Sequence, residues 1–134
     1  MAPIKLQFIG HIAIRVKDME VSKKWYHDML GFIPQSYPVW GDYPIFLSSG
    51  QFAVALFPAN LEDPELPASS RHVKIDHFAF RVHQENFMTA LDHFSHWKIP
   101  FHVQDHHYYE SVYISDPDGH CVELTRETDK NITD

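Results

Sequence analysis

Two segments of the chain alternate apolar and polar residues with the two-residue period of a β-strand. HIAIRV at 11–16 and HFAFRV at 77–82 both carry an aliphatic or aromatic side chain at every second position, with histidine, alanine and arginine between them. Successive side chains of a strand point to opposite faces of a sheet. Each segment is therefore predicted to be a strand with one apolar face, packed on a helix, and one polar face.

Helical periodicity follows each of these strands. After the first strand, Asp18 is a candidate N-cap, and an apolar side chain then recurs every four residues until Gly31. The second helix is expected to end at or before Ile99, because Pro100 disfavours the helical conformation in the residue before it. The apolar positions are Val21, Trp25 and Met29 in the first helix, and Phe87, Leu91 and Phe94 in the second.

The two strand–helix segments are copies of one unit. The histidine, alanine, arginine and valine of HIAIRV recur 66 positions later in HFAFRV, and Ile33–Pro34 recurs as Ile99–Pro100 at the same offset. Ile45 and Gly50 match Ile114 and Gly119 at an offset of 69. This larger offset predicts three extra residues in the second copy, in the loop that contains His106 and His107.

Short β-prone runs complete each copy after its helix. They read IFLSS and FAVALF in the first copy, and SVYIS and CVELT in the second, with turns at Gly50 and at DPDG, 116–119. The order strand, helix, three strands predicts an α+β fold of two modules within one domain, 1–134. We expect module one at about 5–58, a linker at 59–73, module two at about 74–126 and a polar tail at 127–134.

Composition narrows the possible functions. The net charge is −7 and the basic residues are scattered, which argues against nucleic acid and against a membrane surface as partners. The single cysteine, Cys121, excludes an internal disulfide. No apolar run is long enough to span a membrane, and the first ten residues lack the layout of a secretory signal, so a soluble cytoplasmic protein is expected. Histidine is in excess, with 11 of 134 residues.

The polar faces of three predicted strands carry residues that bind metal ions. His11 and His77 occupy the same position of the repeat, and Glu123 shares a face with Cys121 and Thr125 near the end of the chain. If the two modules pack their sheets into a shared trough, these three side chains converge inside it. Two imidazoles and one carboxylate form a facial triad that suits divalent iron or manganese.

At these motifs the sequence resembles the vicinal oxygen chelate superfamily, which includes glyoxalases, bleomycin-resistance proteins, fosfomycin-resistance enzymes and extradiol dioxygenases. The resemblance covers residues 8–126 and rests on GHIAIRVKDMEVSKKWYHDMLGF, IDHFAFRV and YISDPDGHCVEL. It implies paired βαβββ modules that form a cup-shaped mixed sheet around a metal held by His11, His77 and Glu123. It also implies a small substrate that chelates the metal through adjacent oxygens, and a homodimer.

The chain departs from several members of this family. Glyoxalases and epimerases usually take a fourth ligand from the first module, but the offset of 69 maps Glu123 onto Val54, and neither neighbouring alanine can bind metal. Three protein ligands are therefore expected, which leaves open positions on the ion. Fosfomycin-resistance enzymes carry a threonine where Ala13 stands, and their arginine after the glutamate ligand is missing, although Ser111 and Tyr113 resemble their residues.

Extradiol dioxygenases also use the triad, with Fe(II), and their tyrosine ten residues before the glutamate ligand coincides with Tyr113. Their acid–base histidine corresponds to His106 or His107, at a different spacing, and a further histidine of their first module is absent. Tyr113 is a candidate hydrogen-bond donor to a metal-bound oxygen, or else a half-buried strand aromatic. His106, His107 and Glu110 are candidate proton shuttles, or else members of a solvated loop.

Further side chains are candidates for substrate binding. Tyr37, Trp40 and Tyr43 form an aromatic wall over the trough or simply cap the core, and Cys121 is expected to serve packing. The candidate substrate-binding residues are Arg15, Arg81, Trp40 and Ser111.

These observations together predict a metal-dependent enzyme that acts on a small substrate with vicinal oxygens. A dioxygenase is favoured because the triad has three members, and Fe(II) or Mn is favoured over Zn or Ni as the metal. The first alternative is a lyase or isomerase resembling glyoxalases. The second is a binding protein resembling bleomycin-resistance proteins, which sequesters a ligand without turnover.

Overall fold

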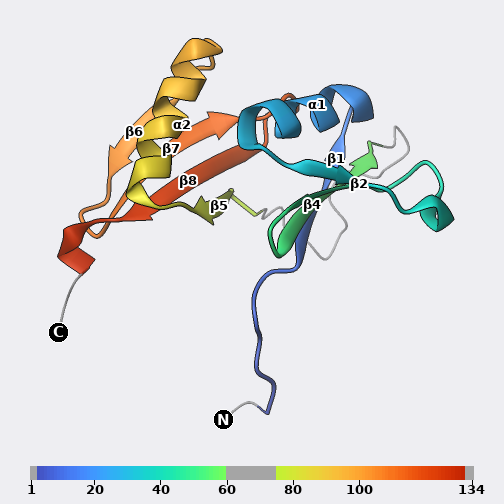
Figure 1. Cartoon of the computed structure of the whole chain (residues 1–134), viewed down its shortest axis with the longest axis horizontal. Coiled ribbons are helices and arrows are strands. Elements are labelled where there is room, and N and C mark those ends of the chain that lie inside the picture. Colours follow the sequence, from blue (N-terminus) through green and yellow to red (C-terminus); the bar gives the residue numbers. More distant parts are fainter. Residues whose placement is uncertain (1–2, 60–74, 132–134) are drawn as a thin grey trace, which may run out of the picture. The chain divides into compact units, whose positions relative to one another are not determined.

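The computed structural model describes residues 3–59 and 75–131, and the chain divides into two compact units, residues 1–63 and 64–134. Each unit is built in the predicted order of strand, helix and three strands (Figure 1). In the first unit the elements are β1 His11–Val16, α1 Met19–Leu30, β2 Ile33–Gln35, the 3-10 helix η1 Pro38–Trp40, β3 Ile45–Ser49 and β4 Phe52–Pro58.

The second unit repeats this arrangement, with β7 longer than its counterpart β3. Its elements are β5 Phe78–Arg81, α2 Gln84–His96, β6 His102–Asp105, β7 Tyr109–Ser115, β8 Cys121–Glu127 and the 3-10 helix η3 Asp129–Asn131. The polar tail predicted at 127–134 therefore begins too early, since Glu127 still belongs to β8. The predicted linker, 59–73, falls almost entirely outside the described residues.

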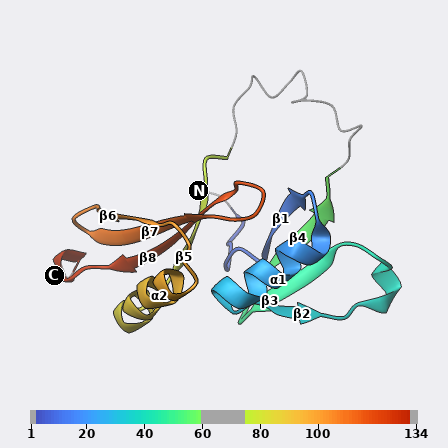
Figure 2. The same cartoon turned by 90° about the horizontal axis from the view of Figure 1, so that it is seen from above.

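Each unit contains one four-stranded mixed sheet, which confirms the predicted α+β class. The strand orders are β1-β4-β3-β2 and β5-β8-β7-β6; the pairs β1–β4 and β5–β8 are parallel, and the other pairs are antiparallel. One helix lies against one face of each sheet and leaves the other face uncovered by any helix of its own unit (Figure 2). The polar residues of β1 and β5 lie on the face without a helix.

Helix α1 begins and ends as the sequence predicts, but its buried face matches the predicted one only in part. The Asp18 carboxylate accepts hydrogen bonds from two backbone N–H groups of the first turn, and Gly31 ends the helix with a φ of 74°. Val21 is 51% exposed, whereas Tyr26 is fully buried and packs edge-to-face on Phe32. Met29 is buried as predicted, so only the first part of the buried line is displaced by one residue.

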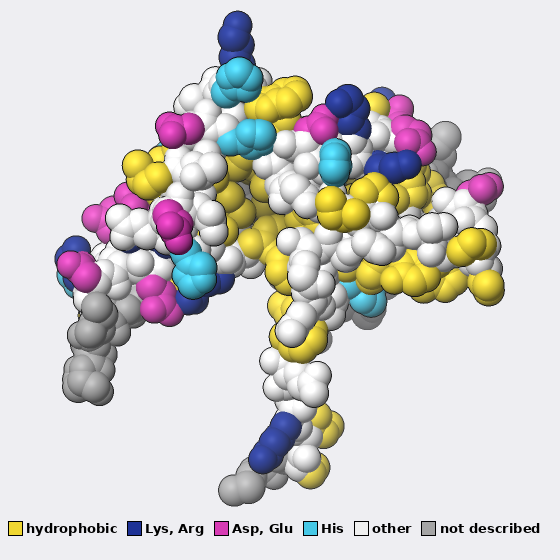
Figure 3. All heavy atoms as spheres, in the orientation of Figure 1, with side chains coloured by type: hydrophobic (Ala, Val, Ile, Leu, Met, Phe, Trp, Pro, Cys, Tyr) yellow, Lys and Arg dark blue, Asp and Glu magenta, His cyan; other side chains and the backbone are white. Residues whose placement is uncertain are grey.

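Helix α2 confirms its predicted apolar face. Phe87 and Phe94 are almost fully buried, and the helix ends at His96, before Ile99. In the view of Figure 3, charged and histidine side chains lie over both helices among uncharged and apolar ones. Among the described residues no helix has the length and apolar character to cross a membrane.

The strand registers correct the predicted alignment of the two copies. Ala13 pairs with Ala55 across β1–β4, and its repeat partner Ala79 pairs with Glu123 across β5–β8. The first-unit counterpart of Glu123 is therefore Ala55, at an offset of 68, and not Val54. Val54 is fully buried, on the helix-covered face of the sheet. The prediction that this position supplies no ligand is unaffected, because alanine has no donor atom.

The predicted loop insertion is also wrong. In the first unit Ala55 pairs with Phe46 of β3, and Phe46 pairs with Gln35 of β2. In the second unit Glu123 pairs with Tyr113 of β7, and Tyr113 pairs with His102 of β6. Gln35 to Phe46 and His102 to Tyr113 both span 11 positions. The difference in residue number between the two copies instead grows by one between the helix and the second strand of each copy. It grows by one more in the turn before the last strand.

Candidate functional site

The face of the second sheet that carries no helix brings His77 and Glu123 together. His77 directly precedes β5, Glu123 lies in the neighbouring strand β8, and His77 Nε2 is 2.8 Å from Glu123 Oε1. The glutamate is 8% exposed. Two donor atoms that bind one ion at about 2.1 Å and at right angles lie about 3 Å apart. The spacing of this pair therefore fits two neighbouring ligands of one divalent ion.

His77 is held from its other side by a carboxylate. Asp76 Oδ2 lies 2.7 Å from His77 Nδ1, so this nitrogen carries the proton that the carboxylate accepts. A neutral ring held in this way presents its Nε2 lone pair to an ion. In the metal-free protein the hydrogen bond to Asp76, followed by the negative charge of Glu123, raises the pKa of His77 above its ordinary value of 6.5.

We expect the substitution Asp76→Asn to lower the pKa of His77 in the metal-free protein, because the neutral amide removes the strongest stabilisation of the imidazolium. The raised pKa stabilises the fold fully below pH 6.5, and this contribution is lost as the pH rises through the folded-state pKa. An NMR titration of the His77 ring would measure the shift. Asp92→Asn on α2 is the control, and an equal shift in both variants would contradict the assignment.

Tyr113 lies next to this pair and shares a hydrogen bond with a histidine. It stands opposite Glu123 in the β7–β8 register, and its hydroxyl is 2.9 Å from His106 Nε2. The His77 and His102 rings lie with their centroids 5.8 and 6.3 Å from the Tyr113 ring. Burial, and then the charge of Glu123, raise the pKa of Tyr113. The phenol is therefore protonated at neutral pH and able to donate a hydrogen bond.

Ser111, predicted to bind substrate, is fully buried beneath this site. Its hydroxyl donates to Glu123 Oε2 over 2.6 Å and lies 2.9 Å from Thr125 Oγ1. The two oxygens of the Glu123 carboxylate therefore have different partners: Oε2 faces the serine, and Oε1 faces His77.

His11 lies at the start of β1 in the first unit, on the exposed face of its sheet. Its ring is 5.8 Å from that of Phe46, which also contacts Tyr37 and Trp40 at 5.7 Å. Tyr37, Trp40 and Phe46 thus form an aromatic cluster beside His11, with Phe46 at its centre, a residue that the sequence pattern did not single out. Tyr43 is 56% exposed.

The remaining proton-shuttle candidates have structural contacts. The His107 backbone N–H donates to the Asp105 carboxylate, and its carbonyl accepts from the Thr128 hydroxyl, which fixes the turn between β6 and β7. Glu110 is half-buried and accepts two hydrogen bonds from the Arg126 guanidinium. Neither residue has a contact with Tyr113 of the kind that His106 makes.

The two candidate arginines lie near the ends of β1 and β5. Arg15 donates to the backbone carbonyl of Pro58 at the end of β4. Arg81 pairs with Glu127 over 2.6 Å and lies over the Tyr109 ring. Both guanidinium groups are exposed, and their predicted role toward a substrate stays a prediction.

A concavity of about 510 Å³ opens beside Tyr113 on the second unit. Apolar side chains dominate its lining, and Tyr113 is the lining residue that the sequence analysis connected with a site. The lining consists of Ile99, Pro100, Phe101, His102, Tyr113, Ile114, Ser115 and Cys121. The signal for His102 was available in principle, since it lies opposite Tyr113 once β6 and β7 are paired.

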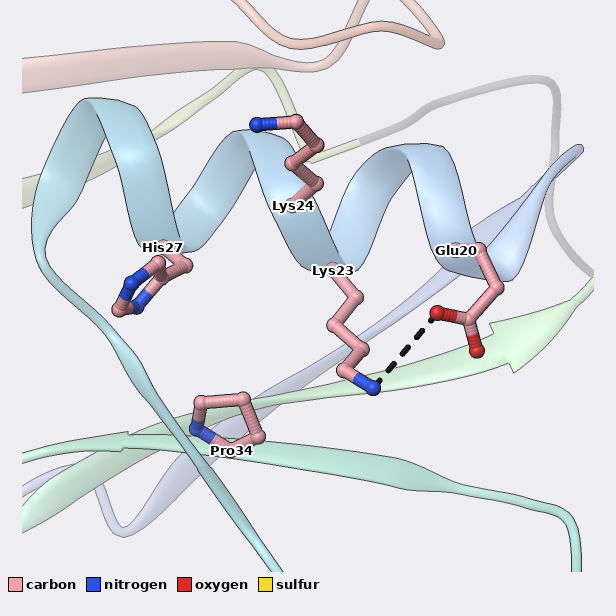
Figure 4. A pocket seen from close by; sticks show the side chains of 5 residues that line it. All are labelled: Glu20, Lys23, Lys24, His27 and Pro34. Atoms are coloured by element: carbon pink, nitrogen blue, oxygen red, sulfur yellow. Dashed lines mark ion pairs between the residues drawn. The ribbon is translucent and has the colours of Figure 1, made fainter.

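A smaller concavity of about 160 Å³ lies along α1 and differs in chemistry (Figure 4). Glu20, Lys23, Lys24, His27 and Pro34 line it. The Lys23 ammonium points toward Glu20, 3.6 Å away, and His27 Nδ1 contacts the Phe32 carbonyl. Lys23 and Glu20 therefore pair with each other, whereas His27 and Lys24 have partners outside the lining.

Within residues 3–59 and 75–131, no three histidine, cysteine or acidic side chains gather in one place in a way that could hold a metal ion. The second unit supplies a pair, His77 and Glu123, and the third predicted ligand, His11, belongs to the first unit. The donor types and spacing of the pair fit a divalent ion, and the complete triad stays a prediction.

Comparison with known proteins gives the family. The chain is 28% identical over 119 residues to the glutathione transferase FosA of Serratia marcescens, covering 89% of this chain and 80% of that protein. It is 25% identical over 134 residues to the metallothiol transferase FosB of Staphylococcus epidermidis, covering 96% and 87%. A glyoxalase/dioxygenase structure from Nostoc punctiforme has a TM-score of 0.76 at 24% identity, covering 96% and 97%. The model of one family matches residues 8–124, and the chain therefore belongs to the Glyoxalase/Bleomycin resistance protein/Dioxygenase superfamily.

Proposed function

We propose that this chain is a metal-dependent enzyme that acts on a small substrate with vicinal oxygens, with His11, His77 and Glu123 as the metal ligands. The observation that carries the proposal is the contact between His77 Nε2 and Glu123 Oε1, 2.8 Å apart, in which each side chain is held from behind by a further partner. Ligands fixed in this way lose little freedom when an ion binds.

A bound divalent ion would supply Lewis-acid chemistry and, if it is redox-active, a means of activating oxygen. The residues around it have separate tasks. Asp76 holds the proton of His77 on Nδ1, Tyr113 holds a proton on its hydroxyl, and His106 accepts or returns that proton at Nε2. The phenol and the imidazole thus form a two-residue path between the site and the β6–β7 loop.

The reaction class that we favour is dioxygenation of a catechol-like substrate. Because Ala55 takes the place of a fourth ligand, only His11, His77 and Glu123 would hold the ion, and a substrate and oxygen would have access to it. The Tyr113–His106 hydrogen bond supplies an acid–base pair beside His77 and Glu123. The concavity next to Tyr113 is mostly apolar, which suits the carbon skeleton of such a substrate.

Transfer of a thiol to an oxygen-bearing electrophile is the second candidate. The sequence likeness to a glutathione transferase and a metallothiol transferase favours it. Ala13 stands where fosfomycin-resistance enzymes carry a threonine, so we do not extend their substrate to this chain. A glyoxalase-like lyase is the third candidate, and a binding protein without turnover is the fourth.

Metal analysis of protein purified without chelator tests the common part of these proposals. About one equivalent of a divalent ion per chain is the expected result, and a metal-free protein that binds no added Fe(II), Mn(II), Ni(II) or Zn(II) would overturn it. Assays with the loaded protein then separate the classes. Oxygen uptake indicates a dioxygenase, thiol consumption with an electrophile a transferase, conversion of thiol adducts of α-ketoaldehydes a lyase, and saturable binding without product a binding protein.

We also propose a homodimer, since symmetric pairs are the commonest oligomers of small soluble proteins. The chain has a mass of 15.7 kDa, so light scattering at micromolar concentration should give about twice that value. A mass of 15.7 kDa in the metal-loaded protein would contradict the proposal.

A further inference from the structure

Two hydroxyl groups stand in line behind the Glu123 carboxylate. Ser111 Oγ is 2.6 Å from Glu123 Oε2 and 2.9 Å from Thr125 Oγ1, and Ser111 and Thr125 are direct partners in the β7–β8 register. The three side chains lie on the same face of the sheet because Thr125 follows Glu123 by two residues. Ser111 is fully buried, so water does not compete for its hydroxyl.

The direction of these hydrogen bonds follows from the chemistry of the groups. An ionised carboxylate only accepts, so the one proton of the Ser111 hydroxyl goes to Glu123 Oε2. The Ser111 oxygen then accepts the proton of Thr125. The chain of donors therefore runs from Thr125 through Ser111 to Glu123 and leaves Oε1 as the carboxylate oxygen that faces His77.

The internal repeat shows that the fold does not require this arrangement. Phe46 of β3 is the first-unit counterpart of Tyr113. Ser111 lies two residues before Tyr113, so its counterpart is Pro44, two residues before Phe46. Ala55 corresponds to Glu123, so Phe57 takes the position of Thr125. The first unit forms the same four-stranded sheet without either hydroxyl. Both hydroxyls thus occur only in the copy that has a carboxylate to hold.

We propose that Ser111, supported by Thr125, is the positioning residue for the metal ligand Glu123: it occupies Oε2 and directs Oε1 toward the ion. This inference rests on the proposed function, since it assigns a role to a residue behind one of the ligands. Hydrogen-bond partners behind metal ligands fix ligand orientation, and their loss commonly weakens metal binding by about 10–100-fold.

The test measures metal affinity of the full chain by competition with a chromogenic chelator, together with the visible spectrum of the Co(II)-loaded protein. Ser111→Ala should weaken Co(II) and Mn(II) binding by about 10-fold or more and change the Co(II) spectrum. Ser22→Ala is the matched control, since Ser22 is a buried serine of α1 in the other unit. It should leave both the affinity and the spectrum unchanged.

Substitutions of Thr125 separate positioning from packing, and they decide the question if Ser111→Ala does not fold. Thr125→Val keeps the shape and removes the hydroxyl, whereas Thr125→Ser keeps the hydroxyl and removes a methyl group. We expect weaker metal binding with valine and nearly normal binding with serine; a purely structural role gives the reverse order.

The two proposals fail in different ways. If the wild-type protein binds no divalent ion, the proposed function is wrong, and the positioning role is wrong with it. If the wild type binds metal and both folded variants, Ser111→Ala and Thr125→Val, bind it as tightly and with the same Co(II) spectrum, only the positioning role is overturned.

Discussion

Addition of a divalent ion to the metal-free protein should raise its free energy of unfolding by about 2.7 kcal/mol when the free ion is at 100 times its dissociation constant. The reason is that only the folded chain holds the proposed histidine and glutamate ligands together. His77→Ala should abolish this gain, because it removes one ligand and also leaves Glu123 without its partner. Denaturant unfolding with and without Mn(II) measures both effects.

His83→Ala is the control for this experiment. His83 is exposed and caps α2 without a side-chain hydrogen bond, so its removal should leave the metal-dependent gain intact. The triple variant that lacks His11, His77 and Glu123 gives the decisive comparison. If it retains the metal content of the wild type, the three residues are not the ligands.

The sequence alone predicts which face of its strand each candidate ligand occupies. Alternation along β1, β8 and the segment formed by His77 and β5 places His11, His77 and Glu123 on polar faces without any knowledge of strand pairing. The repeat aligns the two histidines directly. The order of elements follows in the same way, because strand and helix periods differ clearly over 6 to 12 residues.

The parts that depend on register could not be predicted. Matching Ile45 with Ile114 and Gly50 with Gly119 gave an offset of 69, whereas the strand pairing gives 67 in β3–β7 and 68 in β4–β8. Since a slip of one residue moves a side chain to the other face, the error put the helix-facing Val54 in the place of Ala55.

Contacts between neighbouring strands were hidden from the sequence for the same reason. Ser111 reaches Glu123 because it lies two residues from Tyr113, which stands opposite that carboxylate. His106 reaches Tyr113 from a turn whose shape no periodicity reveals. Sequence reasoning therefore found the candidate ligands and the tyrosine but not the partners that hold them.

Protein loaded with Fe(II) under anaerobic conditions should consume oxygen when some members of a catechol panel are added. Tyr113→Phe should lower the turnover rate by about 100-fold, because the substitution removes the proton that the phenol holds beside the proposed metal ligands. Substrate affinity should change much less, since the ring and its contacts with His77 and His102 remain. Oxygen-electrode rates, together with binding measured in the absence of oxygen, separate the two effects.

Tyr108→Phe is the matched control, because Tyr108 lies in the β6–β7 turn and is 53% exposed; it should turn over at the wild-type rate. His106→Gln tests the other half of the acid–base pair: glutamine can hydrogen-bond to the Tyr113 hydroxyl but cannot take up its proton, so turnover should fall. Zn(II)-loaded protein should consume no oxygen, since zinc has no redox chemistry.

If protein with confirmed Fe(II) occupancy consumes no oxygen with any catechol, the dioxygenase assignment is wrong. Thiol consumption by the same sample in the presence of an oxygen-bearing electrophile and the absence of oxygen would then favour a transferase.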